Sequence, residues 1–415
     1  MTQARPERAI LHVGAPKAGS TFLQGILWDN RSDLLESGIH LPGAGIGDHA
    51  RASQDLRGRE RAPGDPRPDA SGSWDLLAAL ARGSRSPTVV VSDEHLAGAV
   101  PAQVARAVST LAPRQADVVV VTRHPAAALA SAWQERIKLG ARTPFDRWAD
   151  RRLRQTPAAD RLWAEHDPAD VAERWASVVP AAQIHVVLLP AADADRDELW
   201  RRFCRAAAIP PEAAPLRPRF ANQSLGTAEA EYQRRVNERL PEDFGAWNHQ
   251  LVSRNLLGNQ ILAGRSGAGR PALPDRLAAL SAARAHATFD RIETGGYDVV
   301  GDQEDLLRAP GPGATGADDT QVLAVALDAL PQLVAQLAQP AELATLADQA
   351  VAGRDLDGCL DVSAQAVLRL AQDKAITGLT SSASFVKARS RLAAVADRSR
   401  ATARLADRFR ARRQR

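Results

Sequence analysis

One short segment near the start of the chain constrains the fold more than any other. Residues Ile10–Gln24, ILHVGAPKAGSTFLQ, have the pattern of a buried strand, a tight loop and the first turns of a helix. The loop contains Gly14 and Gly19, which let the backbone approach a ligand closely, together with Lys17 and a Ser-Thr pair. N–H groups at a helix start, a lysine charge and hydroxyl donors all favour a bound anion. The segment therefore predicts a phosphate-like anion site between a strand and a helix.

A second segment repeats this strand–turn–helix pattern. Val118–Val121 is a continuous β-branched run, as in a strand buried on both faces of a parallel sheet. Pro125 suits the first position of a helix, where its missing N–H costs nothing. Arg123 follows the strand directly, and Ser131 lies about two turns into the helix. Both side chains are therefore expected near the carboxyl end of the strand.

Strands and helices alternate through the first half of the chain. The expected strands are Ile10–Gly14, Gly38–Leu41, Thr88–Ser92, Val118–Thr122 and Ile184–Leu188. The expected helices are Ser20–Glu36, Trp74–Ala81, Gln103–Ala112, Ala126–Leu139 and Ala169–Val178. This alternation predicts an α/β fold of three layers, P-loop-like, with a parallel central sheet flanked by helices. Ligands of such sheets bind at the carboxyl ends of the strands.

The position of the lysine separates two kinds of anion loop. The nucleotide-binding pattern G-x-x-x-x-G-K-[ST] requires lysine after the second glycine, where this chain has Ser20. Lysine instead stands two residues before Gly19, in the run Pro16-Lys17-Ala18-Gly19-Ser20-Thr21. This run resembles the 5′-phosphosulfate loop of the sulfotransferases that use 3′-phosphoadenosine 5′-phosphosulfate (PAPS). The resemblance covers about residues 8 to 307 and is specific in two motifs.

The resemblance implies PAPS as sulfuryl donor, bound by the residues of that run, with no metal ion. It also implies that Arg123 and Ser131 hold the 3′-phosphate of the donor. His124 departs from the acidic or amide residue that often precedes the proline in that family. Lys17 would then be catalytic as well, since its ammonium can stabilise charge that develops on the leaving phosphate.

The proton acceptor has three candidates. Glu94 follows the strand Thr88–Ser92 and resembles the glutamate base of many carbohydrate sulfotransferases. His95 is its rival, because histidine titrates near neutral pH. His49, in a loop expected over Gly43–Ser73, is the third. A purely structural role for this group remains open, with Asp93 capping the next helix.

The chain is expected to divide into a sulfotransferase-like α/β domain over residues 1–307, a Pro/Gly-rich linker over 308–318 and a helical region over 319–415. The net charge of +4 conceals an asymmetry, since residues 387–415 carry +9 and the remainder −5. The terminal helix is therefore basic and amphipathic. It either packs on its neighbours or contacts an anionic membrane or nucleic acid. Two cysteines and no long apolar stretch suggest a cytoplasmic protein.

The function predicted from the sequence is transfer of a sulfuryl group to a hydroxyl or amine of an unidentified carbohydrate, glycolipid or small metabolite. The segment Arg142–Asp167 is expected to form a helical lid on the acceptor side. Trp133, which follows Ser131 closely, is the tryptophan expected nearest the donor. One alternative is a P-loop kinase or hydrolase, because Val89–Glu94 resembles a magnesium-binding strand. Another is a non-catalytic nucleotide-binding protein.

Overall fold

A computed structural model describes residues 7–372, apart from 60–68, 192, 196, 216–223, 264, 266–268 and 312. The expected basic helix at the end of the chain lies outside these residues.

A six-stranded parallel sheet forms the centre of the molecule, in the order β2-β3-β1-β4-β5-β6. The strands are β1 (Arg8–Gly14), β2 (Ile39–His40), β3 (Thr88–Ser92), β4 (Gln115–Thr122), β5 (Ile184–Leu188) and β6 (Asp298–Val300). Ala9, Leu11 and Val13 pack on one face of the sheet and Ile10 on the other, as the two-residue period of a strand requires. The order reverses at β1, so the crevice beside its carboxyl end is the expected ligand position.

Helices cover both faces of the sheet. One layer contains α1 (Ser20–Asp29), α2 (Arg31–Glu36) and α10 (Glu198–Ala207). The other contains α3 (Ile46–Leu56), α4 (Ser73–Arg82), α5 (Pro101–Leu111), α9 (Pro168–Ala176) and α13 (Asp275–Thr294). The predicted α/β architecture is therefore confirmed.

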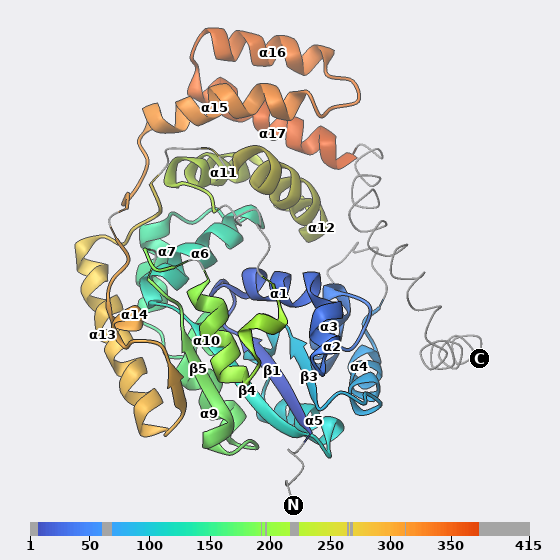
Figure 1. Ribbon diagram of the computed structural model, residues 1–415. Helices are drawn as coiled ribbons and strands as arrows, with labels where there is room; N and C mark the ends of the chain where they lie inside the picture. Colours follow the sequence, from blue (N-terminus) through green and yellow to red (C-terminus); the bar gives the residue numbers. More distant parts are fainter. Residues whose placement is uncertain are drawn as a thin grey trace, which may run out of the picture.

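A third hydrophobic core lies beyond the sheet, in a group of helices that we call the helical cap. It contains α6 (Pro125–Lys138), α7 (Phe145–Leu153), α11 (Thr227–Arg239), the π-helical segment η4 (His249–Leu262), α15 (Asp319–Val334), α16 (Ala341–Ala352) and α17 (Leu356–Gln372). Figure 1 shows α15, α16 and α17 outermost, with α11 and α12 (Ala246–Asn248) between them and the sheet. The helices after residue 318 thus share one core with α6 and α11.

Two sequence predictions of local structure were wrong. The expected helix Ser20–Glu36 breaks at Asn30, whose side-chain amide donates to the carbonyl of Ile26 at 2.9 Å and ends α1. The loop expected over Gly43–Ser73 contains the helix α3, which buries His49, Ala52 and Leu56 against the sheet. Its polar composition concealed this narrow apolar face.

The segment Arg142–Asp167, expected to be helical, forms two helices, α7 and α8 (Arg161–His166).

Candidate active site

The loop between β1 and α1 has an unusual backbone. Gly14 has φ 114°, Lys17 φ 63° and Gly19 φ 92°, all in the left-handed region. For a residue with a side chain this conformation costs on the order of 1–3 kcal/mol, and such residues cluster at functional sites. No acidic residue lies in the first turn of α1, so the positive end of this helix is not neutralised from within. The loop residue Pro16 is half-buried, Ala18 and Ser20 are buried, and Thr21 is exposed.

The two loop glycines pack closely against other parts of the protein. A Cβ on Gly14 would lie 2.8 Å from the carbonyl oxygen of Glu94, and one on Gly19 would lie 2.5 Å from Cδ2 of Leu199. We had expected these glycines to let the backbone approach a ligand. The contacts instead show that they let the loop pack against the chain after β3 and against α10. Because Gly14 has no side chain, the backbone of Glu94 can lie directly against the anion loop.

Arg123 joins the end of β4 to the same loop. Its Nη1 donates to the carbonyl oxygen of Lys17 at 2.9 Å. Its Nε is buried and has no hydrogen-bond partner in the described part of the chain. Burial, followed by the nearby positive charge of Arg270, lowers the pKa of Arg123 to about 10. A buried cationic N–H donor without a hydrogen-bond partner suits an anionic ligand group.

Lys17 is held by a carboxylate from the helical cap. Its Nζ lies 2.8 Å from Oε2 of Glu135 on α6, while Oε1 of Glu135 accepts from Nε of Arg254 on η4. Burial by itself would raise the pKa of the Glu135 carboxyl, but Lys17 and Arg254 together lower it to about 2. Glu135 is therefore a permanent anion at neutral pH and competes with any anionic ligand for Lys17.

One face of α6 is turned toward the loop. Ser131, Glu135 and Lys138 are spaced by four and three residues, so they lie above one another along the helix. The contact of Glu135 with Lys17 fixes which way this face points. Lys138 is buried and donates to Oδ1 of Asn259 at 2.9 Å. Burial, together with the charges of Lys17 and Arg254 and against the opposing effect of Glu135, lowers the pKa of Lys138 to about 8.

Glu94 begins the short helix η1 (Glu94–Gly98), directly after the carboxyl end of β3. Its Oε2 accepts a hydrogen bond of 2.8 Å from Nε2 of Gln24 on α1. The neighbouring His95 pairs through Nδ1 with Oδ1 of Asp93 at 3.0 Å, and its side chain is 42% exposed. The hydrogen bond to Asp93 raises the pKa of His95, against the effect of burial. His95 thus retains a proton to higher pH, which disfavours it as a proton acceptor beside Glu94.

The other histidines near β1 serve the core. His49 is buried, its Nε2 donates to the carbonyl of Pro42 at 2.9 Å, and its Nδ1 accepts from the backbone N–H of Ser92 at 3.1 Å. With both ring nitrogens engaged and its pKa lowered by burial, His49 is poorly arranged for proton transfer to a ligand. His12 is buried, with Nδ1 2.7 Å from Oγ of Ser92, and burial lowers its pKa to about 4. His12 is therefore a hydrogen-bonded core residue.

The tryptophans lie mainly in the core. Trp133, Trp148 and Trp163 are buried in the helical cap. The Trp133 indole donates to the carbonyl of Thr143 at 2.9 Å and packs on Phe145, beside a cavity of about 170 Å³. Trp28 is half-buried and meets His49 edge to face.

Sequence reasoning missed several side chains near the anion loop. Gln24, Glu135 and Arg254 make polar contacts there, and His166 is buried nearby. His166 is buried at the end of α8 with an unpartnered Nδ1. Burial, together with the positive charges of Arg123 and Lys17 and against the effect of Glu165, lowers its pKa to about 4. Of these residues, only Gln24 could have been predicted from the sequence. It lies about one helical turn after Ser20 and therefore shares a face of the helix with it.

The described residues contain no group of three or more His, Cys, Asp or Glu side chains arranged to hold a metal ion. Within the same residues no helix combines the length and apolar character needed to cross a bilayer.

Comparisons with known proteins give one structural likeness. No family model matches the sequence, and no curated protein is similar enough to match. Among solved structures, a sulfotransferase from Alicyclobacillus acidocaldarius is similar at 20% sequence identity and a TM-score of 0.34. The match covers 52% of this chain and 87% of that chain. The roles of individual residues are therefore argued from the contacts of this chain alone.

Proposed function

We propose that the protein is a sulfotransferase that moves a sulfuryl group from PAPS to a hydroxyl or amine. The observation that carries this proposal is the pairing of two cations at one loop. Lys17 comes from the loop after β1 and Arg123 from the end of β4, and they are joined by the 2.9 Å hydrogen bond from Arg123 to the Lys17 carbonyl. The buried, unpartnered Nε of Arg123 supports a second anion position beside the first.

The residues divide between the two anionic ends of such a donor. Residues Pro16 to Thr21 would hold the 5′-phosphosulfate with backbone N–H groups, hydroxyls and the Lys17 ammonium. Arg123 and Ser131 would hold the 3′-phosphate. Ser131 suits this role because it shares the face of α6 on which Glu135 contacts Lys17.

Glu94 is the residue we assign as general base. Its carboxylate is held by Gln24 at 2.8 Å, and its backbone packs against Gly14 at the end of β1. When bound, PAPS supplies the sulfuryl group and leaves as 3′-phosphoadenosine 5′-phosphate. The acceptor oxygen or nitrogen gains the bond to sulfur, and its proton passes to Glu94. Lys17 stabilises the negative charge on the departing phosphate, in competition with its contact to Glu135.

The direct test is transfer of radiolabelled sulfate from PAPS to a pooled set of sugars, glycolipids and small alcohols and amines, in the presence of EDTA. The proposal predicts labelled product with the native chain. Lys17→Ala should lower the rate on the order of 10²–10³-fold. Glu94→Gln should abolish transfer while leaving affinity for 3′-phosphoadenosine 5′-phosphate unchanged. Transfer of phosphate from ATP, dependent on magnesium, would replace this proposal with a kinase.

A further inference from the structure

Three arginines converge on one carboxylate oxygen beside the residue assigned as base. Oε1 of Glu165, on α8, lies 3.0 Å from Nη2 of Arg57, 2.7 Å from Nη2 of Arg59 and 3.3 Å from Nε of Arg161. One oxygen offers two lone pairs and cannot satisfy three guanidinium groups fully. We call these four residues the arginine cluster.

The arginine cluster is joined directly to the segment that carries Glu94. Nη1 of Arg57 donates to the carbonyl of His95 at 2.9 Å, and a Cβ on Gly98 would lie 2.3 Å from Nη2 of Arg57. The helix α8 packs along η1. The residue after Glu165 is His166. Burial lowers the pKa of His166, and the positive charges of Arg123 and Lys17 contribute to this lowering. α8 therefore connects the arginine cluster to η1, the short helix that begins with Glu94.

Within the arginine cluster itself, positive charge exceeds negative charge. Three guanidinium groups against Glu165 leave a surplus of two positive charges. Asp93 adds an attractive charge near Arg59, which it shares with His95. The Nε of Arg59 is buried without a partner among the described residues. A buried guanidinium N–H without a partner suits an anionic ligand group.

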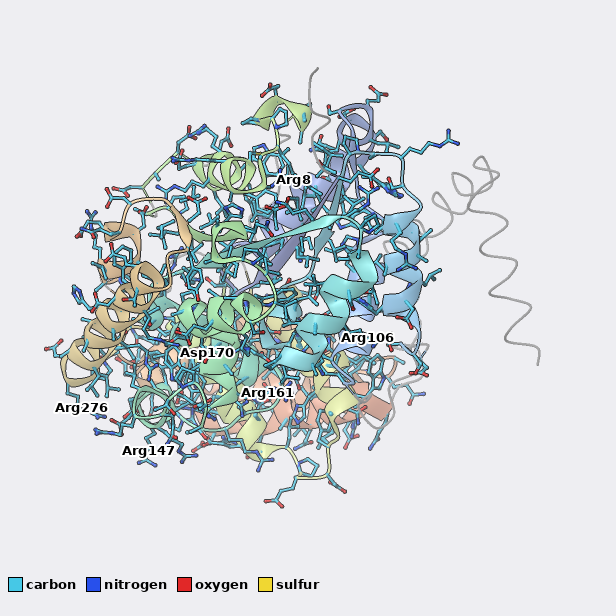
Figure 2. The ribbon with its side chains drawn as sticks, turned by 90° about the horizontal axis from the view of Figure 1, so that it is seen from below. Arg8, Arg106, Arg147, Arg161, Asp170 and Arg276 are labelled. Atoms are coloured by element: carbon cyan, nitrogen blue, oxygen red, sulfur yellow. The ribbon has the colours of Figure 1, made fainter. Side chains whose placement is uncertain are left out.

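Part of the arginine cluster remains open to solvent. The side chain of Arg161 is 72% exposed and that of Arg59 27%, whereas that of Arg57 is only 8% exposed. In Figure 2, Arg161 of α8 appears near Asp170 of the adjoining helix α9, well separated from Arg8 at the start of β1. A ligand can therefore reach Arg59 and Arg161, while Arg57 fixes the cluster to the backbone of η1.

We propose that the arginine cluster is an acceptor subsite for a carboxylate or phosphate group, so that the natural acceptor is a hydroxylated or aminated anion. This inference rests on the proposed function, because it places the reacting group of the acceptor at Glu94. Arginine suits the role because its planar fork binds carboxylate and phosphate oxygens in pairs. Arg59 and Arg161 act as specificity residues, exchanging part of their contact with Glu165 for the acceptor anion.

The test uses the full chain saturated with 3′-phosphoadenosine 5′-phosphate, titrated by calorimetry with glucose, glucuronate and glucose 6-phosphate. The two charged sugars should bind more tightly than glucose, on the order of tenfold or more. The stronger of the two identifies carboxylate or phosphate as the preferred group. In the double variant Arg59→Gln, Arg161→Gln this preference should disappear. Arg147→Gln, an exposed arginine on α7, should leave it unchanged.

Equal affinity for charged and neutral sugars, no measurable binding of the charged sugars, or a charge preference that survives the double variant would each overturn the inference. Binding of 3′-phosphoadenosine 5′-phosphate is measured first and reports on the proposed function separately. The double variant should bind this nucleotide as the native chain does, because neither arginine contacts Lys17 or Arg123 in the described contacts.

Discussion

At the scale of single residues, the central feature is that Lys17 already has an anionic partner. Glu135 holds it at 2.8 Å, and Arg254 holds Glu135 in turn. An incoming phosphosulfate must therefore compete with a carboxylate of low pKa. The sequence predicted Lys17 and Arg123 because both follow strands that end at the same edge of the sheet. It did not predict Glu135, since that contact depends on how α6 is rotated and on how η4 packs over it.

Replacing Glu135 tests this competition. In Glu135→Gln, Lys17 is no longer held by a carboxylate, so affinity for 3′-phosphoadenosine 5′-phosphate should rise severalfold in a calorimetric titration. Glu242→Gln, an exposed glutamate in the turn before α12, is the matched control and should change nothing. Weaker nucleotide binding by Glu135→Gln would show that Glu135 orients Lys17 for the ligand instead of competing with it.

The same variant predicts a pH dependence of stability. The pKa of Glu135 is lowered in the folded chain from 4.5 to about 2, so its ion pairs stabilise the fold fully above about pH 4.5. This contribution is lost as the pH falls from 4.5 toward 2. The difference in unfolding free energy between the native chain and Glu135→Gln should shrink across that interval, as measured by denaturant titration. A difference independent of pH would contradict the assigned ion pairs.

At the scale of elements, strand positions were predicted well because buried parallel strands are continuous β-branched runs. Thr88–Ser92 and Ile184–Leu188 match the expected bounds. Helices with a narrow apolar face were harder to predict. α3 was read as loop because His49 and Ser53 are among the residues that it buries. The break between α1 and α2 depends on one side-chain hydrogen bond of Asn30, which no periodicity shows.

Gly14 tests the junction between β1, the loop and η1. In Gly14→Ala the new Cβ would meet the Glu94 carbonyl at 2.8 Å, at a φ of +114° that alanine avoids. We expect a loss of stability of about 1–3 kcal/mol by thermal or denaturant unfolding. Gly72→Ala is the control for backbone strain alone, since Gly72 has φ +76° and open space around it. An equal loss in both variants would show that the contact with Glu94 is unimportant.

At the scale of the whole molecule, the helical cap ties the end of the described chain to the site. α15 and α17 share a hydrophobic core with α6 and α11, and α6 supplies Ser131 and Glu135. Tyr232 of α11 and Ser363 of α17 are linked by a hydrogen bond of 2.6 Å. The Ala/Leu-rich composition predicted that this region is helical. It did not indicate which surface these helices cover, because an apolar helix face does not specify its partner.

This shared core predicts that the cap and the sheet domain unfold together. Leu330→Ala, at a fully buried position of α15, should cost about 2–5 kcal/mol and shift a single denaturant transition. The helical circular-dichroism signal and the binding of 3′-phosphoadenosine 5′-phosphate should be lost over the same range of denaturant concentration. An early transition that removes helix signal but leaves nucleotide binding intact would show that the region after residue 318 is a separate unit.

The central claim is that Lys17 and Arg123 form two anion positions suited to a 3′-phosphorylated nucleotide. It is tested most directly by calorimetric titration with 3′-phosphoadenosine 5′-phosphate, 5′-AMP and ADP in EDTA. The native chain should prefer the 3′-phosphorylated nucleotide over 5′-AMP on the order of tenfold to a hundredfold, and Arg123→Ala should remove most of that preference while changing 5′-AMP binding little. Equal affinity for all three nucleotides, or an equal loss of affinity for both in Arg123→Ala, would contradict the assignment of the site.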